Sequence, residues 1–557
     1  MSAPASIIDT RRPQMFPTLA PAEIERVRRF GTVRSFAAGE AIATVGSPGH
    51  GLIIVLAGHV DITQRAESGR RTLIVTHTPG QFMGELAQLA GRPSLVDAYA
   101  TEPVEALIIP PERLRALLIA EAELGERIMR ALILRRVGLL ETGAGGPVIV
   151  GRADNGDVLR LEGFLRRNGH PHLQLDPDTD PDAKALIERF HVDPGQLPIV
   201  LCPGGQLLRN PGDNELARCI GLVGPIDPDR RYDVAVVGAG PAGLATAVYA
   251  ASEGLSVLVL DCRSFGGQAG ASSRIENYLG FPTGISGMAL MARAYNQAQK
   301  FGVEMAIPDE ANELSLEKSD KAGFSLKLAS DERVRTRAVV IASGARYRRL
   351  DVPNLEAFEG SSVHYWASPL EGKLCARQEV ALVGAGNSAG QAVVYLASQV
   401  AKVWLLARRD LSKTMSRYLV DRINSLPNVE VVIGAQITAL EGEGGVLEAV
   451  RVRDKSDVEK RHPLRHLFLF IGAEPNTDWL AGSGVALDPK GFVLTGAEVG
   501  NRRPLETSRE GVFAIGDVRA GSVKRVAAAV GEGAQVVATL HGYLAATGGA
   551  PSVLAKP

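Results

Sequence analysis

The pattern of apolar and polar positions divides the chain into segments of different character. Between residues 15 and 142, short apolar runs alternate with glycine turns and lead into an amphipathic stretch, which predicts a small antiparallel β-roll and a helix over 111–140. Residues 147–224 predict the element order β-α-β-α-β-β-α. The stretch 230–546 alternates strand and helix patterns, which predicts two Rossmann-like three-layer α/β domains in a multidomain protein.

The clearest motif is a strand, a glycine-rich turn, a helix and a second strand between residues 233 and 261. In the GxGxxG turn the first glycine allows the tight turn, the second allows close approach of a pyrophosphate, and the third lets the helix sit on the strand. The helix N-terminus favours an anion, and the acidic residue about twenty positions on suits a ribose hydroxyl. The predicted dinucleotide site comprises Gly238, Gly240, Pro241, Ala242, Gly243 and Asp261.

A second unit of the same kind begins with the apolar run 380–383. Its predicted nucleotide site comprises Gly384, Gly386, Asn387, Ser388 and Ala389. Where the second strand ends, the chain carries Arg408 and Arg409 and no carboxylate. Because arginine suits a ribose 2′-phosphate and Asp or Glu suits a 2′-hydroxyl, we predict NADPH in preference to NADH. The alternative is a solvated arginine pair.

Composition excludes several classes of protein. The 557 residues suffice for three or four domains, and the net charge of −1 gives no argument for nucleic-acid binding. No apolar stretch has the length of a membrane span, and the N-terminus lacks the apolar core of a signal peptide. The four cysteines form no CxxC and no metal-ligand spacing. We therefore predict a cytoplasmic protein with mostly reduced thiols, no metal site, and Cys202 and Cys219 as buried packing residues.

Two segments after the first motif, around Gly266-Gly267-Gln268 and Glu276-Asn277, resemble the thioredoxin reductase family of FAD enzymes. The resemblance implies that Gln268 and Asn277 lie against the flavin ring, where amides match its donors and acceptors. It also implies that Asp517 contacts the ribityl chain and that the protein is a homodimer. Further positions that the resemblance assigns to FAD are Gly267, Ala342, Gly344, Gly516, Arg525 and Val526. A cation at Arg525 would stabilise the anionic reduced flavin; the alternative is a surface arginine.

One stretch departs from that family. In thioredoxin reductases the region corresponding to residues 364–369 carries the CxxC that takes electrons from flavin, whereas this chain reads His-Tyr-Trp-Ala-Ser-Pro, and Cys375 stands alone. A dithiol relay needs two thiols in contact. The chain therefore resembles the branch without this disulfide. We predict that the flavin itself is the catalytic group and passes electrons from NADPH to a small-molecule or protein acceptor that is not a disulfide. The alternative is a redox or nucleotide sensor or scaffold that binds FAD and NADPH without significant turnover.

Residues 15–142 resemble the cyclic-nucleotide-binding domain family in Gly39-Glu40, in the run from Leu52 to Ile62 and in the segment that starts at Gly84. The resemblance assigns the ribose contact to Glu85. The position of the arginine that pairs with the cyclic phosphate is filled by Ser94, and Arg92 lies two residues early. The candidate nucleotide site is Gly84, Glu85, Leu86, Arg92 and Ser94. The favoured alternative is a roll kept for docking or regulation without a nucleotide.

Residues 147–224 resemble a thioredoxin-like domain, which implies a cis peptide bond at Pro198. The place of that family's CxxC reads Gly-Arg-Ala-Asp-Asn-Gly, so no thiol is present there for exchange. The Pro-rich first twenty or so residues are expected to form a loose arm. The expected domains are 15–142 (cyclic-nucleotide-binding-like), 147–224 (thioredoxin-like), 230–345 with 495–546 (FAD) and 346–494 (NADPH).

Overall fold

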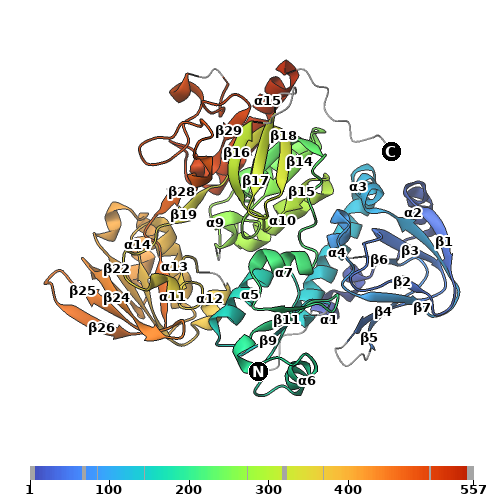
Figure 1. The fold of residues 1–557 in the computed structure, drawn as a ribbon, viewed down its shortest axis with the longest axis horizontal. Helices are drawn as coiled ribbons and strands as arrows, with labels where there is room; N and C mark the ends of the chain where they lie inside the picture. Colours follow the sequence, from blue (N-terminus) through green and yellow to red (C-terminus); the bar gives the residue numbers. More distant parts are fainter. Residues whose placement is uncertain are drawn as a thin grey trace.

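The protein was analysed as a computed structural model, which describes residues 7–65, 71–84, 86–143, 145–272, 274–316, 323–367, 369–500 and 503–547. Figure 1 shows the N-terminal part (blue) on one side, a small α/β part (green) beside it, a large central sheet, and a further α/β part (orange) on the opposite side. Within the described ranges, no helix combines the length and apolar character that crossing a membrane requires.

The N-terminal part is a β-roll, as predicted. Two four-stranded antiparallel sheets, in the orders β1-β8-β3-β6 and β2-β7-β4-β5, enclose an apolar core; we call these strands the N-terminal roll. The strands are β1 (Thr32–Phe36), β2 (Ala41–Ala43), β3 (Leu52–Ala57), β4 (Val60–Arg65), β5 (Arg71–His77), β6 (Phe82–Met83), β7 (Asp97–Ala100) and β8 (Val104–Ile109). The helices are α1 (Ile7–Met15), α2 (Pro21–Val27), α3 (Pro111–Ala120) and α4 (Ala122–Thr142).

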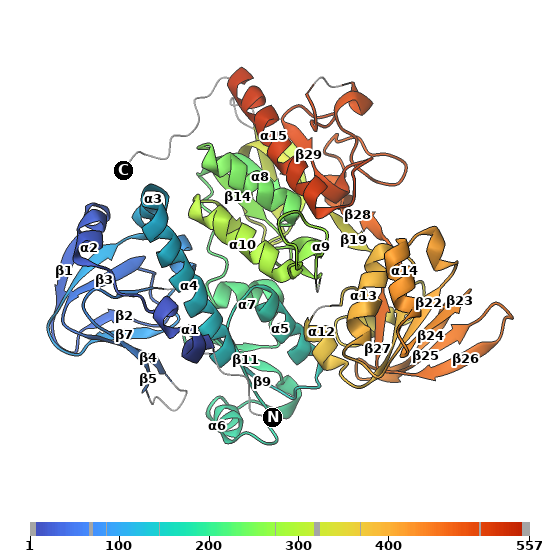
Figure 2. The same ribbon diagram turned by 180° about the vertical axis from the view of Figure 1, so that it is seen from behind.

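Two expectations for this part were wrong. The helix predicted over 111–140 is two helices, because Glu121 leaves the helical conformation with φ −115° and ψ 77°. Residues 7–15 are not a loose arm: they form α1, which packs against α4 along one side of the N-terminal roll (Figure 2).

The small α/β part has the predicted element order. Its sheet order is β10-β9-β11-β12, with β9 and β10 parallel, and the Leu197–Pro198 peptide bond is cis as predicted. The elements are β9 (Val148–Val150), α5 (Gly156–Arg167), β10 (Leu173–Leu175), α6 (Pro181–Arg189), β11 (Ile199–Leu201), β12 (Leu207–Arg209) and α7 (Asp213–Cys219).

The cysteines of this part form a bond that we did not expect. Cys202, after β11, and Cys219, at the end of α7, are joined in a disulfide across a Cα–Cα distance of 6.2 Å, which is within the range that a disulfide spans. They are therefore not separate packing thiols, because the fold brings the end of the strand to the end of the helix. Among the described residues, Cys262 and Cys375 are free.

The central sheet has seven strands in the order β15-β14-β13-β18-β17-β16, with β29 paired to β18. Its strands are β13 (Arg231–Val237), β14 (Val257–Leu260), β15 (Glu304–Ala306), β16 (Ala311–Leu316), β17 (Phe324–Leu328), β18 (Arg333–Ile341) and β29 (Val512–Ala514). One face carries α8 (Pro241–Ser252), α10 (Gly287–Lys300) and α15 (Val526–Ala546), which share a buried apolar cluster with the sheet (Figure 2). Strands β13, β14, β15, β18 and β29 are parallel, as a Rossmann-like unit requires.

The last α/β part repeats this plan. Its parallel sheet has the order β20-β27-β21-β22-β23, and a three-stranded sheet β24-β25-β26 packs beside it. The elements are β20 (Val363–His364), α12 (Pro369–Leu374), β21 (Glu379–Val383), α13 (Asn387–Ala397), β22 (Lys402–Ala407), α14 (Arg417–Asn424), β23 (Val429–Ile433), β24 (Gln436–Glu443), β25 (Val446–Arg453), β26 (Glu459–Pro463) and β27 (His466–Leu469).

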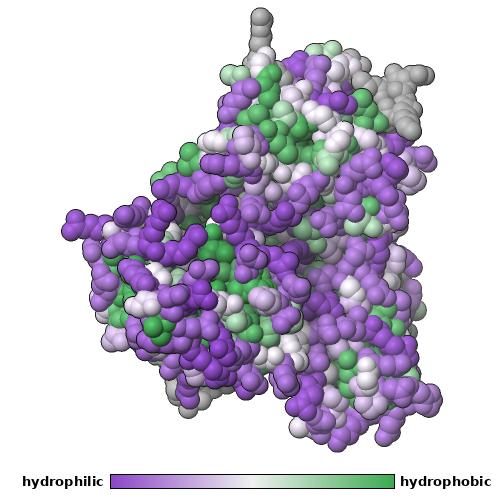
Figure 3. Space-filling view, turned by 60° about the vertical axis from the view of Figure 1, so that its left-hand side comes forward, coloured by the Kyte–Doolittle hydropathy of each residue, from purple (hydrophilic) through white to green (hydrophobic). Residues whose placement is uncertain are grey.

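The chain crosses between the two large sheets through an antiparallel pair, β19 (Ala345–Tyr347) and β28 (Ala473–Pro475). Leu480, Val485 and Val493 follow the second crossing and belong to the apolar core of the central sheet. The chain therefore returns to the central sheet before residue 494, where we expected the boundary between the NADPH and FAD domains. Figure 3 shows one face of the molecule, on which hydrophilic residues cover most of the surface and hydrophobic residues gather in small separate areas.

Candidate functional site

The first glycine turn has the form of a dinucleotide cradle. Gly238, after β13, has φ +116°, and a Cβ at this position would lie 2.1 Å from the Ala342 carbonyl oxygen, so only glycine fits. Gly240 caps α8, whose first residues are Pro241 and Ala242. The free N–H groups of this helix end can receive a pyrophosphate. The backbone here fits the predicted dinucleotide.

Asp261 lies at the end of β14, beside this turn. One carboxylate oxygen accepts the Ala239 N–H at 2.9 Å, and the other accepts the N–H groups of Arg263 at 3.0 Å and Ser264 at 3.3 Å. Burial raises the pKa of Asp261 above its ordinary value, although these three bonds act in the opposite direction. A carboxylate offers about four acceptor sites, so Asp261 both fixes the turn and retains capacity for a ribose hydroxyl.

The two amides expected at the flavin ring differ in their surroundings. Gln268, in the short helix α9 (Gly267–Gly270), is half-buried and donates from Nε2 to the Ala345 carbonyl at 2.6 Å. Gln268 therefore connects the turn at Gly266 and Gly267 to strand β19. Asn277 is exposed in the loop between Ile275 and Ile285, which are joined by a β-bridge.

The turn after β29 is held by a residue to which the sequence analysis gave no role. Glu532 accepts the Gly516 N–H at 2.6 Å and the Arg519 guanidinium at 2.5 Å. These bonds fix the orientation of Asp517, whose pKa is raised by burial. In the sequence, Glu532 is recognisable as a charged residue between two glycines. Its partner Gly516, however, lies sixteen residues earlier, so the sequence alone does not show what Glu532 binds.

Helix α15 begins at Val526, and Arg525 is its N-cap. Gly531 and Gly533 lie within this helix, and Gly533 is at its contact with α8. A Cβ at Gly533 would be 2.7 Å from the Ala242 carbonyl oxygen. Arg525 is exposed at the helix N-terminus, and its contact with the flavin stays a prediction.

The second glycine turn repeats the first. Gly384 has φ +155°, a Cβ there would lie 2.6 Å from the Phe470 carbonyl oxygen, and Gly386 caps α13. Asn387, the first residue of α13, accepts the Ser416 N–H at 2.6 Å. Ser388 follows it and Ala389 is buried against the turn. This turn also fits a dinucleotide pyrophosphate.

Arg408 and Arg409 follow β22 directly, and both side chains are exposed. Within the described part of the chain, neither forms an ion pair or a hydrogen bond. Both guanidinium groups are therefore available for an anionic ligand at the edge of this nucleotide site.

Three aromatic side chains lie close together at the end of strand β19. Tyr347 lies 5.8 Å from Tyr365 and 6.5 Å from Trp366, measured between ring centroids. Trp366 donates from Nε1 to Glu371 at 2.9 Å, and the Arg167 guanidinium of α5 lies 5.7 Å from its ring centroid. The small α/β part therefore contacts the last α/β part at this tryptophan. Ser368 lies outside the described residues.

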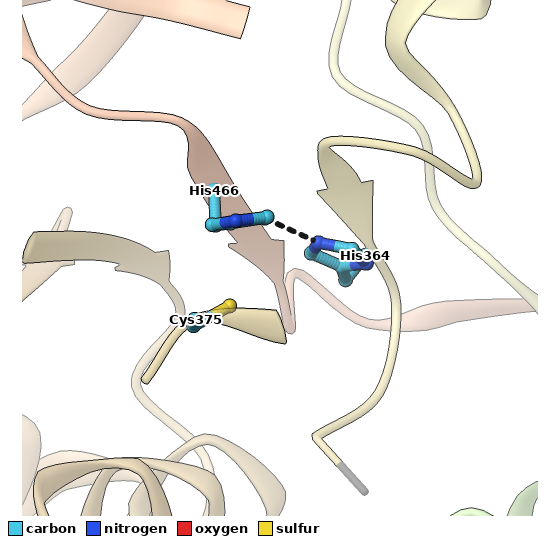
Figure 4. A group of neighbouring side chains, drawn as sticks. All are labelled: His364, Cys375 and His466. Atoms are coloured by element: carbon cyan, nitrogen blue, oxygen red, sulfur yellow. Dashed lines mark hydrogen bonds between the residues drawn. The ribbon is translucent and has the colours of Figure 1, made fainter. Parts of the chain in front are cut away.

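Cys375 lies in a buried group with His364 and His466 (Figure 4). The donor atoms of the three side chains lie within 4.8 Å of one another, and no fourth His, Cys, Asp or Glu joins them among the described residues. The two rings form a direct hydrogen bond of 3.1 Å, although they are 102 residues apart in the sequence. Burial lowers the pKa of His364 to about 4 and that of His466 to about 3, and it raises the pKa of the Cys375 thiol.

The candidate cyclic-nucleotide residues are not gathered at one place. Arg92 donates from Nη2 to the Tyr295 hydroxyl of α10 at 2.8 Å, and the Ser94 hydroxyl donates to the Val96 carbonyl at 2.8 Å. Ser94 and Gly84 line a cavity in the N-terminal roll, and Arg92 is not among the described residues that line it. Arg92 instead reaches α10 through its bond to Tyr295. Leu86 begins a short helix, and Glu85 lies outside the described residues.

Two segments of the chain match known protein families. Residues 232–533 match the family model described as pyridine nucleotide-disulphide oxidoreductase, and residues 33–121 match that of the cyclic nucleotide-binding domain. The chain is 33% identical over 323 residues to an alkyl hydroperoxide reductase of Pseudomonas putida, a match over 58% of this chain and 60% of that protein. It therefore spans less than two thirds of the length of this relative.

Other relatives match over most of their length. Thioredoxin reductase of Mycolicibacterium smegmatis is 32% identical over 303 residues, which are 54% of this chain and 93% of that protein. The structure of T. acidophilum thioredoxin reductase superposes with a TM-score of 0.51 at 29% identity and covers 57% of this chain and 100% of that one.

Proposed function

Because the chain belongs to the pyridine nucleotide-disulphide oxidoreductase family, we propose that it takes electrons from NADPH through FAD and passes them to an acceptor other than a disulfide. FAD and NADPH are the cofactors of the thioredoxin reductases in this family. The observation that carries the proposal is the pair of glycine turns at Gly238 and Gly384, each between a parallel strand and a helix N-terminus. When bound, FAD supplies the electron-transfer chemistry.

The residues of the chain hold and orient the cofactors in this proposal. The N-terminus of α8 receives the FAD pyrophosphate, Asp261 accepts a ribose hydroxyl, and Asp517 accepts a hydroxyl of the ribityl chain. Hydroxyl donors suit Asp517, whose carboxylate is partly desolvated. The α13 N-terminus, together with Arg408 and Arg409, receives NADPH.

The positions of the cysteines support an electron acceptor other than a disulfide. Residues 364–369 contain no cysteine, and the next one, Cys375, is buried. Burial, with Glu371 nearby, raises the pKa of this thiol, so it stays protonated and is a poor nucleophile. Electrons therefore leave from the flavin to a small molecule or a docked protein. Trp366 occupies the region where a dithiol would be needed.

We further propose that the N-terminal parts regulate the reductase. Asn168, from the end of α5, donates to the carbonyl of Arg263, two residues after Asp261, at 3.2 Å. Arg218 of α7 pairs with Glu332 at 2.6 Å. A sensor that binds both cofactors without significant turnover is the second candidate function, because these contacts join the small α/β part to the central α/β part at two separate places.

Rapid mixing of the FAD-loaded protein with NADPH separates the two functions. Fast bleaching of the flavin absorbance, followed by multiple turnovers with an artificial dye, supports the oxidoreductase. Binding of NADPH without bleaching supports the sensor. A colourless protein that gains no flavin band when FAD is added contradicts both.

Homodimerisation through the reductase half and a cytoplasmic location are further proposals. Light scattering that gives the mass of one chain at micromolar concentration would refute the dimer. The location is tested by fractionating cells and probing the thiol state of Cys202 and Cys219, whose disulfide is unusual for a reducing compartment.

A further inference from the structure

The N-terminal roll encloses a cavity of about 340 Å³. Strands of both sheets supply apolar walls, among them Ile53, Ile62, Val75, Met83 and Ala98. Phe16, which follows α1, and residues of α4 line the cavity as well. This volume is at the lower end of the range for small-molecule sites, about 300–1,000 Å³.

One buried cation lines this cavity. Arg135 of α4 is 8% exposed, and its guanidinium lies between the rings of Phe16 and Phe82, at 5.1 and 4.6 Å from their centroids. Its Nε donates to the Met15 carbonyl and its Nη1 to the Gly84 carbonyl, both at 2.9 Å. Its Nη2 is buried and has no hydrogen-bond partner among the residues that the structure describes.

No acidic side chain in the described part of the chain compensates the charge of Arg135. Burial lowers its pKa to about 9, which still leaves it protonated at neutral pH. Among the described residues, no Asp or Glu lines the cavity and none pairs with Arg135. A buried cation without a counter-ion is costly, so the site favours an anion that brings the missing charge.

A second unpartnered polar atom lines the same cavity. His77, at the end of β5, is 2% exposed, and no described residue forms a hydrogen bond with its Nδ1. Its ring lies 5.7 Å from that of Phe16, on which Arg135 also packs. Burial and the charge of Arg135 lower the pKa of His77 to about 3, so the ring is neutral and Nδ1 can carry a proton for donation.

We propose that this cavity binds an organic monocarboxylate with an aliphatic or aromatic body, its carboxylate at Arg135 Nη2 and His77 Nδ1 and its body against the apolar walls. One carboxylate neutralises one arginine, and two donors match its two oxygens. A cyclic nucleotide is a poorer match. Ser94 fills the arginine position, its hydroxyl already donates to a backbone carbonyl, and the apolar walls offer few partners to a ribose and a base.

Calorimetric titration of the full-length protein tests the site. The probes are decanoate and 4-phenylbutyrate, with 1-decanol and cyclic AMP for comparison. We expect at least one of the two carboxylates to bind one per chain, more tightly than decanol and cyclic AMP. Arg135→Met should weaken carboxylate binding by roughly tenfold or more, because a hydrogen-bonded charge pair is lost, and should leave decanol binding within about twofold.

The control is Arg130→Met, on the same helix, where an exposed arginine pairs only with Glu126 among the described residues. It should bind carboxylates as the parent does. If Arg135→Met does not fold, Ile62→Phe replaces it; this variant fills the cavity and should abolish carboxylate binding. No binding of either carboxylate, unchanged affinity in the folded variant, or tighter binding of cyclic AMP would overturn the proposal. None of these readouts depends on the reductase activity.

Discussion

Tyr295 connects the N-terminal roll to the flavin side of the central sheet. Its hydroxyl accepts the bond from Arg92, and its ring stacks on Phe265 with a centroid distance of 4.4 Å and an interplanar angle of 26°. Phe265 directly precedes the turn that carries Gln268. The side chains of Tyr295 and Phe265 therefore lie between Arg92 and the turn with Gln268, a predicted flavin contact.

The pair Arg92–Tyr295 should show a measurable coupling energy. Arg92→Ala and Tyr295→Phe should each lower the free energy of unfolding by about 1.5–3 kcal/mol, the range for a hydrogen bond to a charged group. The double variant should cost little more than either single one. Denaturant titration followed by flavin fluorescence gives the cycle. Arg113→Ala, an exposed arginine of α3, is the control. Additive losses would show that the bond is not formed.

Arg408 and Arg409 should determine the preference for NADPH. Replacing both with alanine should raise the KM for NADPH at least tenfold and leave that for NADH nearly unchanged, because contacts to a phosphate are worth about 1.5–3 kcal/mol each. Steady-state dye reduction with both nucleotides measures this. Arg417→Ala, a 95% exposed arginine of the same part, should have no effect. Equal kcat/KM for the two nucleotides in the parent protein would contradict the assignment.

Cys375→Ser should leave NADPH-dependent dye reduction within about twofold, a change below ~0.4 kcal/mol in barrier height. The reason is that a buried, protonated thiol without a partner thiol takes no part in electron transfer. A thioredoxin-coupled insulin assay should stay at background for the parent protein. Robust disulfide reduction that disappears in the variant would reveal a relay through this single cysteine.

The buried histidines should make the protein sensitive to mild acid. His364 and His466 have pKa values lowered by burial from 6.5 to about 4 and about 3. Below pH 6.5 the unfolded chain takes up protons that the folded chain does not, so stability falls as the pH drops from 6.5 toward 4. The slope should be about 1.4 kcal/mol per pH unit for each histidine.

The variant His466→Asn tests this by calorimetry between pH 5 and 8. It should flatten the dependence of the melting temperature on pH, whatever its effect at pH 8. His191→Asn, at an exposed position with φ +50°, is the control and should leave the slope unchanged. An unaltered slope in His466→Asn would show that this ring is protonated in the folded protein.

Local patterns in the sequence predicted most of the elements and both glycine turns. Gly238 and Gly384 were identifiable because a positive φ and close backbone contact leave no room for a side chain. The cis bond at Pro198 was also predictable, since the resemblance places a proline before the third strand of the small sheet. These features depend on neighbours in the sequence.

Contacts between distant segments were not predictable in this way. Arg92 and Tyr295 are 203 residues apart, and no local pattern in the sequence indicates that they bind each other. The Cys202–Cys219 disulfide and the His364–His466 pair also depend on how separate elements pack. The close approach of α15 to α8 at Gly533 is a further contact between segments that are far apart in the sequence.

The contact between Arg167 and Trp366 limits how the last α/β part can turn. The chain enters that part through β19 and returns to the central sheet through β28, and these two strands pair with each other. A rotation of that part about the two strands would separate the indole of Trp366 from the guanidinium of Arg167, and Ser361 from Gly156 at the start of α5. The small α/β part therefore opposes such a rotation.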